Sequence, residues 1–265
     1  MTEDGGPKLR GEVEQANAAR MYDFLLGGGH NFEVDRARAR EAIAANPHLP
    51  AAARANRAFL FRVVNWCLDR GIDQFLDLGS GVPTVGNVHE VAHRRNPAAR
   101  VAYVDVEPVA VAHSRQLLAD TPGATITHAD LRHPGTVLAA PGVAGLLDFT
   151  RPVALLTVAV LHFVPDDPAA VLTAYREVLA PGSIVALSHG SEDHDDPELD
   201  ERIRIGTLAY RTSTTPITPR SRAQLHELMA GLDLVEPGLV DVTDWPTPTP
   251  DTPVAGFYGC VGEVR

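Results

Sequence analysis

The sequence predicts an α/β fold in which a mostly parallel sheet carries helices on both faces. From residue 71 onward, short apolar runs alternate with stretches of helical periodicity, which is the pattern of repeated β-α units. Three of these runs carry an acid at their carboxyl ends, Asp77, Asp105 and Asp130, and the first leads into a turn with Gly79 and Gly81. Carboxylates and a glycine turn at neighbouring strand ends suit the ligand site of an open α/β sheet.

The first 70 residues predict helices. Residues 1–12 are polar and glycine-containing, and we expect a disordered tail there. Apolar residues recur at helical spacing over residues 13–26, and the glycines at 27–29 end this helix. A second helix over residues 33–45 ends before Pro47, and a third over residues 51–70 carries one apolar stripe. We therefore expect a helical cap over residues 13–70 and one ligand-binding domain over residues 71–265.

The remaining elements follow from periodicity and from helix and strand breakers. Strands are expected over residues 74–78, 101–104, 124–128, 153–158 and 183–187, with helices over residues 87–95, 109–119 and 168–179. Helices over residues 197–211 and 221–230 precede two apolar runs at 232–235 and 256–261. The proline- and threonine-rich residues 246–253 predict a loop. Asp166 and Asp167, directly before Pro168, predict the N-terminal cap of a helix.

The composition excludes several classes of protein. A chain of 265 residues, 45% of them hydrophobic, can bury a full core, and a formal net charge of −11 argues against a general nucleic-acid binder. No apolar run approaches the roughly 20 residues of a membrane span. The first ten residues lack the apolar centre of a secretory signal, so we expect a cytoplasmic protein. Cys67 and Cys260 match no zinc or redox spacing, and their apolar surroundings predict buried thiols.

The glycine turn favours S-adenosylmethionine over a dinucleotide. A dinucleotide site asks for a third glycine at position 84, where this chain has Thr84, and Pro83 offers no N–H to a phosphate. S-adenosylmethionine has no phosphate and needs carboxylates for its ammonium and ribose groups. By position, we expect Asp77 near the ammonium, Asp105 near the ribose hydroxyls and Asp130 near the adenine amino group.

Segments spread over nearly the whole chain resemble one family. They are residues 19–28, with the element Tyr-Asp-x-Leu-Leu-Gly-Gly, and residues 31–32, 35–36, 54–57, 75–84, 86–90, 103–105, 129–132, 159–167 and 236–240. The chain is thereby similar to actinobacterial S-adenosylmethionine-dependent methyltransferases long catalogued as a domain of unknown function, within the Rossmann-like class I methyltransferases. The resemblance implies a seven-stranded, mostly parallel sheet with an antiparallel last strand. The cofactor-binding residues we expect are Asp77, Gly79, Ser80, Gly81, Asp105, Val106, Asp130, Leu131 and Ala159.

Two dipeptides depart from the family pattern. Gly29-His30 stands where Lys-Asp is expected, and Val106-Glu107 stands where Asn-Asp is expected. Neither departure removes a carboxylate assigned to the cofactor. We therefore expect them to affect contacts with the methyl acceptor.

Three residues are candidates for the chemistry. His162 follows the fourth strand at the sheet edge where substrates enter, so it is the first candidate for a base or an acceptor contact. Its alternative role is to brace the turn at residues 161–163. His30 and Tyr22 would approach from a cap that closes as a lid, unless residues 27–31 are only a helix cap. His189 has a weaker case. Residues 54–57, which open the third helix, either steady the lid, contact the cofactor carboxylate or pack between helices.

The acidic loop over residues 191–196 is interpreted as a solvated loop. Its acids and histidine are crowded in one segment and lack the spacing of a coordination site, so no metal is expected.

These observations together predict a methyltransferase that uses S-adenosylmethionine on a small-molecule acceptor and releases S-adenosylhomocysteine. We expect no nucleic-acid or membrane partner, and a homodimer stays open. The alternative is a non-catalytic S-adenosylmethionine-binding regulatory module. An NAD-dependent oxidoreductase is disfavoured by Thr84 and by the lack of a Tyr-x-x-x-Lys pair.

Overall fold

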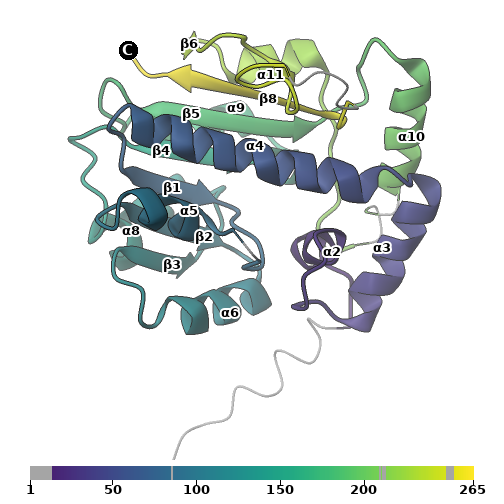
Figure 1. Ribbon diagram of the computed structural model, residues 1–265, viewed down its shortest axis with the longest axis horizontal. Coiled ribbons are helices and arrows are strands. Elements are labelled where there is room, and N and C mark those ends of the chain that lie inside the picture. Colours follow the sequence, from purple (N-terminus) through teal and green to yellow (C-terminus); the bar gives the residue numbers. More distant parts are fainter. Residues whose placement is uncertain (1–13, 85, 209, 211–212, 249–253) are drawn as a thin grey trace, which may run out of the picture.

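The computed structural model describes residues 14–84, 86–208, 210, 213–248 and 254–265. The predicted tail over residues 1–12 lies outside them, as does most of the predicted loop over residues 246–253. One sheet forms the centre of the molecule (Figure 1). Its strands are β1 (Gln74–Leu78), β2 (Arg100–Asp105), β3 (Ala124–His128), β4 (Ala154–Val158), β5 (Ile184–Gly190), β6 (Asp233–Leu234), β7 (Val240–Asp241) and β8 (Phe257–Glu263).

The strand order is β3-β2-β1-β4-β5-β8-β6, with β7 also paired to β8. Neighbouring strands along the part of this order that runs from β3 to β5 are all parallel. Strand β8 runs antiparallel to β5. The predicted α/β class is therefore confirmed, and so is the antiparallel direction of the last strand in the chain. The described residues hold eight strands instead of seven because the two-residue β7 pairs with β8 through Val240 and Gly259. Such a short pairing leaves no alternating pattern in the sequence.

Helices account for most of the other elements. They are α2 (Ala18–Leu25), α3 (Glu33–Ala45), α4 (Leu49–Asp69), α5 (Val88–Arg95), α6 (Pro108–Leu118), α7 (Pro134–Ala139), α8 (Pro141–Ala144), η1 (Leu161–Phe163), α9 (Pro168–Arg176), α10 (Pro197–Leu208) and α11 (Arg222–Leu228). The Asp167 side chain caps α9 by accepting from Ala170 N at 2.9 Å, as predicted. The helices α7 and α8 were not predicted, because six and four residues are too few to show helical periodicity. Both begin with a proline, Pro134 and Pro141. Each stands in the first turn of its helix, where proline is tolerated.

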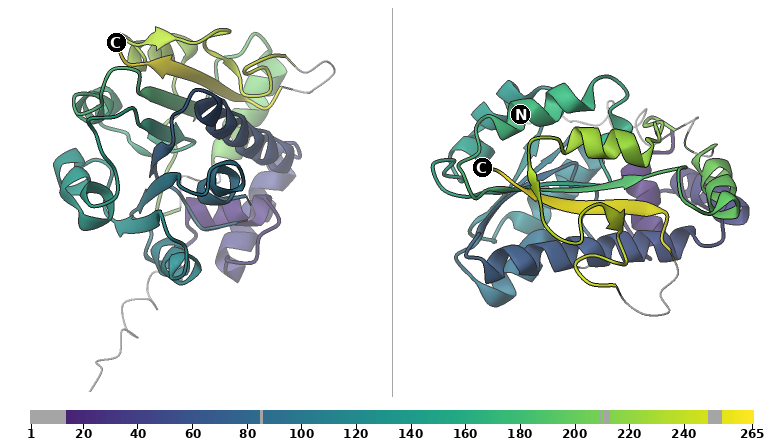
Figure 2. Two further views of the ribbon diagram at one scale, coloured as in Figure 1. Left: turned by 60° about the vertical axis from the view of Figure 1, so that its left-hand side comes forward. Right: turned by 90° about the horizontal axis from the view of Figure 1, so that it is seen from above.

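Two hydrophobic layers cover the two faces of the sheet. Along β1, Leu76 and Leu78 belong to one layer and Phe75 to the other, because successive side chains of a strand point to opposite faces. The first layer includes residues of α9 and α11, and the second includes residues of α4 and α5. Figure 2 shows the sheet edge-on, with α4 and α11 on opposite sides. Cys67 and Cys260 are fully buried, as predicted. Within the described residues, no helix is long and apolar enough to cross a membrane.

The helices α2, α3 and α10 gather beyond the end to which the parallel strands point (Figure 1). Helix α2 begins at Ala18 because the Asn17 side chain caps it by accepting from Ala19 N at 2.8 Å. Helix α4, in contrast, runs along the sheet and packs on β4 and β8. The predicted division of the chain at residue 70 stays a prediction.

A buried arginine ties this helical group to the sheet. Arg20, which is 1% exposed, donates from Nε to Asp35 Oδ2 at 2.8 Å and from Nη1 to Glu107 Oε1 at 2.5 Å. Glu107 follows β2 and caps α6 by accepting from Ala110 N at 2.6 Å. The ion pairs thus join α2, α3 and the start of α6.

Candidate functional site

A pocket of about 600 Å³ opens at the carboxyl ends of β1, β2 and β4. Its other walls come from α2, α4, η1, α10 and the segment after α10. Eleven of the twelve predicted site residues line it: Tyr22, Asp77, Gly79, Ser80, Gly81, Asp105, Val106, Asp130, Leu131, Ala159 and His162. The remaining one, His30, does not.

The glycine turn lets the backbone approach the pocket. Gly79 and Gly81 both have φ of +69°, a conformation that residues with a Cβ rarely adopt. A Cβ on Gly79 would lie 2.1 Å from Val160 Cγ2, so the turn packs directly against the chain that leaves β4. A Cβ on Gly81 would find its nearest neighbour, Ala19 Cβ, only at 3.9 Å. The space beside Gly81 is therefore open to a ligand.

Replacing Gly79 with alanine is expected to destabilise the protein by about 2–4 kcal/mol, because backbone strain adds to the clash with Val160. Gly71→Ala is the matched control. Gly71 also has a positive φ, of +76°, but a Cβ there would meet no atom within 4 Å. It should cost only about 1 kcal/mol, and equal losses in urea denaturation would contradict the steric part of this explanation.

Asp77 is a buried carboxylate without a partner among the described residues. Its side chain is 7% exposed and accepts no hydrogen bond from them. Burial raises the pKa of Asp77 to about 7, the Arg57 charge opposes that shift, and the Asp105 charge adds to it. Arg57 Nη2 donates to Thr84 Oγ1 at 2.9 Å, while its buried Nε has no partner. Two opposite charges thus line one pocket without forming a salt bridge.

The other two predicted carboxylates are already engaged. Asp105 Oδ2 accepts from Gly81 N at 2.6 Å, and Oδ1 accepts from Glu107 N at 2.8 Å. Burial nevertheless raises the pKa of Asp105. Asp130 accepts from the guanidinium of Arg132 through both carboxylate oxygens, and these hydrogen bonds lower its pKa. Each carboxylate oxygen has two lone pairs, so both side chains can still accept from a ligand.

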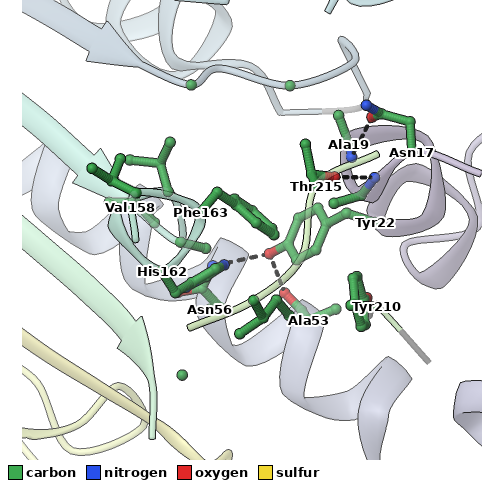
Figure 3. A pocket seen from close by; sticks show the side chains of 18 of the residues that line it. Asn17, Ala19, Tyr22, Ala53, Asn56, Val158, His162, Phe163, Tyr210 and Thr215 are labelled. Atoms are coloured by element: carbon green, nitrogen blue, oxygen red, sulfur yellow. Dashed lines mark hydrogen bonds between the residues drawn. The ribbon is translucent and has the colours of Figure 1, made fainter. Parts of the chain in front are cut away.

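The hydroxyl of Tyr22 holds two helices together. It accepts from Asn56 Nδ2 at 3.0 Å and donates to Ala53 O at 2.9 Å, which joins α2 to α4 (Figure 3). Asn56 is fixed in turn because its Oδ1 accepts from Ser188 Oγ at 2.6 Å. Tyr22 therefore presents its ring to the pocket while its proton is committed to a backbone carbonyl.

His162 lies in the short helix η1, and its ring nitrogens have no hydrogen-bond partner among the described residues. Nδ1 is buried, and the side chain is 4% exposed. Burial holds the pKa of His162 well below its usual value, and the charges of His189 and Arg220 act in the same direction. The imidazole is therefore neutral near pH 7. Figure 3 shows it beside Asn56 and Phe163, facing Tyr22.

Arg220 holds the backbone that carries His162. It donates from Nη1 to Leu161 O at 2.9 Å and from Nη2 to Val164 O at 2.6 Å. It also contacts His189 Nε2 at 3.1 Å, while the other ring nitrogen of His189 contacts Gly190 O at 2.7 Å. Both nitrogens of His189 are thus engaged, and its place is behind the site.

His30 faces away from the pocket. Its backbone N–H donates to Asp23 Oδ2 at 2.9 Å, and its exposed ring packs against that of His113 on α6, with centroids 4.4 Å apart. The carboxylate of Asp23 also accepts from Asn31 Nδ2 at 2.7 Å, which fixes the chain after the triple glycine. His30 therefore does not belong to the pocket lining.

The far wall of the pocket was not predicted. It includes Ile203, Tyr210, Thr215, Ile217 and Phe257. Residues 213–219 contain two prolines and three threonines, which is the composition of an ordinary loop. Nothing in this segment of the sequence therefore indicates that it lines the site. These residues reach it by contacts distant in sequence, such as that of Asn17 Nδ2 with Thr214 Oγ1 at 3.1 Å.

Comparison with known proteins identifies the family. The family profile of the S-adenosyl methyltransferases matches residues 7–264. This chain belongs to the S-adenosyl methyltransferase family. It is an S-adenosylmethionine-dependent methyltransferase, and the predicted family and cofactor are confirmed. A comparison with curated proteins gave no match.

Two solved structures of actinobacterial proteins are similar over their whole length. A DUF574 family protein from Streptomyces avermitilis is 34% identical, with a TM-score of 0.88, over 96% of this chain and 99% of that chain. A protein from Thermobifida fusca with a provisional methyltransferase assignment is 36% identical, with a TM-score of 0.89, over 99% of this chain and 100% of that chain. The magnesium protoporphyrin IX methyltransferase of Synechocystis, solved with bound SAH, shares the fold at 16% identity and a TM-score of 0.53, over 92% of this chain and 91% of that chain.

The pocket residues fit S-adenosylmethionine. The methionine part of this methyl donor carries an ammonium and a carboxylate, and the pocket offers the unpartnered carboxylate of Asp77 and the unsatisfied guanidinium of Arg57. Ser80 Oγ, also buried and without a partner, lies in the same glycine turn. Asp105 and Asp130 supply acceptors for hydroxyl and amino groups. These charged and polar groups therefore match a nucleoside that carries an ammonium and a carboxylate but no phosphate.

Proposed function

We propose that this methyltransferase acts on an uncharged small molecule that binds next to S-adenosylmethionine in the same pocket. The observation that carries the proposal is the distribution of charge along the lining. The charged side chains come from the strand ends, the start of α6 and α4, whereas α2, η1, α10 and the segment after it contribute uncharged ones. Such a cavity suits a charged cofactor at one end and a neutral acceptor at the other.

In the proposed arrangement Asp77 accepts from the ammonium of the cofactor and Arg57 pairs with its carboxylate. The backbone at Gly79 and Gly81 lies against the methionine part. Asp105 accepts from the ribose hydroxyls, and Asp130 accepts from the adenine amino group. Ser80, Val106, Leu131 and Ala159 form the surrounding walls.

When bound, S-adenosylmethionine supplies a methyl group on a sulfonium, which is already a good leaving group. The chain's own residues therefore mainly hold the two reactants in line and keep water out. Helix α2 closes one side of the pocket, and the hydrogen bonds of Tyr22 to α4 keep that wall in place. Of the three candidates for a proton acceptor, His162 is the one that lines the pocket and has no hydrogen-bond partner for its side chain among the described residues.

Tritium transfer tests the proposed function. The protein is incubated with S-adenosylmethionine labelled on the methyl group and an actinobacterial extract that has been divided by ultrafiltration. We expect label to appear in the small-molecule fraction. Label only in protein or nucleic acid would contradict the proposal, and tight cofactor binding without any transfer would favour the regulatory alternative.

The pH dependence of S-adenosylhomocysteine binding follows from Asp77. Because its pKa in the free protein is about 7, Asp77 must lose a proton before it can pair with an ammonium at lower pH. Affinity should therefore fall as the pH drops below about 7, approaching a tenfold loss per pH unit, and it should fall again at alkaline pH as the ligand's amino group deprotonates.

Calorimetric titration over this pH range measures the effect directly. Proton release on binding, seen by comparing buffers of different ionisation enthalpy, should be largest below pH 7. Asp77→Asn is the control, with weak binding that varies little between pH 5 and pH 7. A wild-type affinity that stays constant over that interval would contradict the pairing of Asp77 with the ammonium.

A further inference from the structure

Among the described residues, one end of the pocket has no charged side chains that could bind the charged groups of the cofactor. All charged residues of its described lining belong to the elements assigned to the cofactor: Arg57, Asp77, Asp105, Glu107, Asp130 and Arg132. The lining from α2, η1, α10 and the following segment is uncharged and rich in rings, with Tyr22, Phe163 and Tyr210 (Figure 3). Phe257 of β8 completes it. We call this part the aromatic chamber. A charged ligand group would lose its water there without gaining a counterion.

The polar atoms of the chamber are mostly satisfied by the protein. The hydroxyl of Tyr22 and the amide of Asn56 are engaged with each other and with α4 and β5. Thr215 Oγ1 accepts from Ala18 N at 3.0 Å, and Thr214 Oγ1 accepts from Asn17 Nδ2. Among the buried side-chain nitrogens and oxygens of this described wall, His162 Nδ1 is the one without a partner. An unpaired polar group at a pocket wall indicates a ligand group that completes it.

The neutral state of His162 restricts which ligand group that is. A neutral imidazole has one N–H and one lone pair, so it can accept a proton from a hydroxyl but offers no charge to a carboxylate. His189 and Arg220, packed behind the ring, both oppose its protonation. Glu107, Asp77 and the other acids of the lining come from the cofactor side, and none of them raises the pKa of His162.

Taking the proposed function as its basis, we propose that the aromatic chamber binds a neutral hydroxyaryl acceptor whose hydroxyl donates to His162. The rings of Phe163, Tyr22 and Phe257 then pack against the aromatic part of the acceptor. In the reaction the oxygen–methyl bond forms as the sulfur–methyl bond breaks, with its electron pair returning to sulfur. The hydroxyl proton passes to the free ring nitrogen of His162 and from there to solvent.

Three naphthalene compounds probe the chamber without turnover. The protein is saturated with S-adenosylhomocysteine and titrated with 2-naphthol, 2-methoxynaphthalene and 2-naphthoate. We expect 2-naphthol to bind about tenfold more tightly than 2-methoxynaphthalene, which has the same ring but no proton to donate. We expect 2-naphthoate to bind more weakly still, because its charge is desolvated.

Two variants separate the role of the ring nitrogen from that of packing. His162→Leu keeps a side chain of similar size without an acceptor, and it should remove the advantage of 2-naphthol over 2-methoxynaphthalene. His162→Gln restores an acceptor atom and should recover part of that advantage. Both should bind S-adenosylhomocysteine with wild-type affinity, since His162 is not assigned to the cofactor.

The outcomes distinguish this inference from the function on which it rests. If the wild type binds S-adenosylhomocysteine but prefers 2-naphthoate, or binds 2-naphthol and 2-methoxynaphthalene equally, the hydroxyaryl inference is wrong while the proposed function stands. If the folded protein does not bind S-adenosylhomocysteine, the proposed function itself fails. A preference for 2-naphthol that persists unchanged in His162→Leu would remove His162 from the acceptor site.

Discussion

Replacing Asp77 with asparagine is expected to weaken S-adenosylhomocysteine binding by roughly 10- to 100-fold and to make the free protein more stable. The loss of affinity follows because a charge-assisted hydrogen bond to the ligand's ammonium disappears. The gain in stability follows because the folded protein holds this carboxylate without a partner among the described residues, at a raised pKa of about 7. Asparagine has nearly the same shape and carries no charge to desolvate.

The sign of the stability change can be checked against pH. A carboxyl group whose pKa is higher in the folded than in the unfolded state costs stability as the pH rises from about 4 to about 7. Asp77→Asn removes that cost, so its advantage should be small near pH 4 and reach about 1–3 kcal/mol above pH 7.

Calorimetric titration and urea denaturation measure the two effects on the same samples. Asp233→Asn is the matched control, because Asp233 is an exposed acid paired with Arg265 at the surface. It should leave ligand binding unchanged and should not raise stability. An Asp77→Asn protein that binds S-adenosylhomocysteine like the wild type would contradict the assigned position of the ammonium.

Replacing Arg20 with methionine is expected to cost about 3–5 kcal/mol of stability, the largest loss we predict for one side chain. Methionine keeps much of the packing volume but leaves Asp35, which is fully buried, and Glu107, which is nearly so, without their shared cation. Since Glu107 also caps α6 beside Asp105, we expect weaker cofactor binding as a second effect.

Urea denaturation again provides the measurement. Arg38→Met is the control, since Arg38 forms a pair with Glu41 that is largely exposed to water. It should lose little stability because exposed pairs contribute little. A loss below about 1 kcal/mol for Arg20→Met would show that the buried ion pairs do not hold the helices against the sheet.

The fold was predictable because it depends on local patterns. The run from Phe75 to Leu78 is fully buried, as a central strand requires, and its parallel neighbours bring Asp105 and Asp130 to the same edge of the sheet. Asn17 shortened the first helix by capping it four residues after its predicted start. The short helices α7 and α8 were missed because so few residues show no periodicity.

The acceptor side of the pocket was less predictable because it depends on contacts between distant segments. Asn17 and Thr214 are 197 residues apart in sequence, yet they meet at the pocket wall. The sequence marked Tyr22 as a polar candidate but could not show that Asn56 and a carbonyl engage its hydroxyl. His30 belongs to the predicted glycine segment, but Asp23 fixes that segment with the histidine outward.

A crystal structure of the complex with S-adenosylhomocysteine tests the central claim most directly. We predict that the ligand's amino nitrogen lies about 3 Å from an Asp77 carboxylate oxygen. Its carboxylate should contact Arg57, and its sulfur should face the aromatic chamber. A ligand bound elsewhere, or one whose amino group points away from Asp77, would contradict this account of the site.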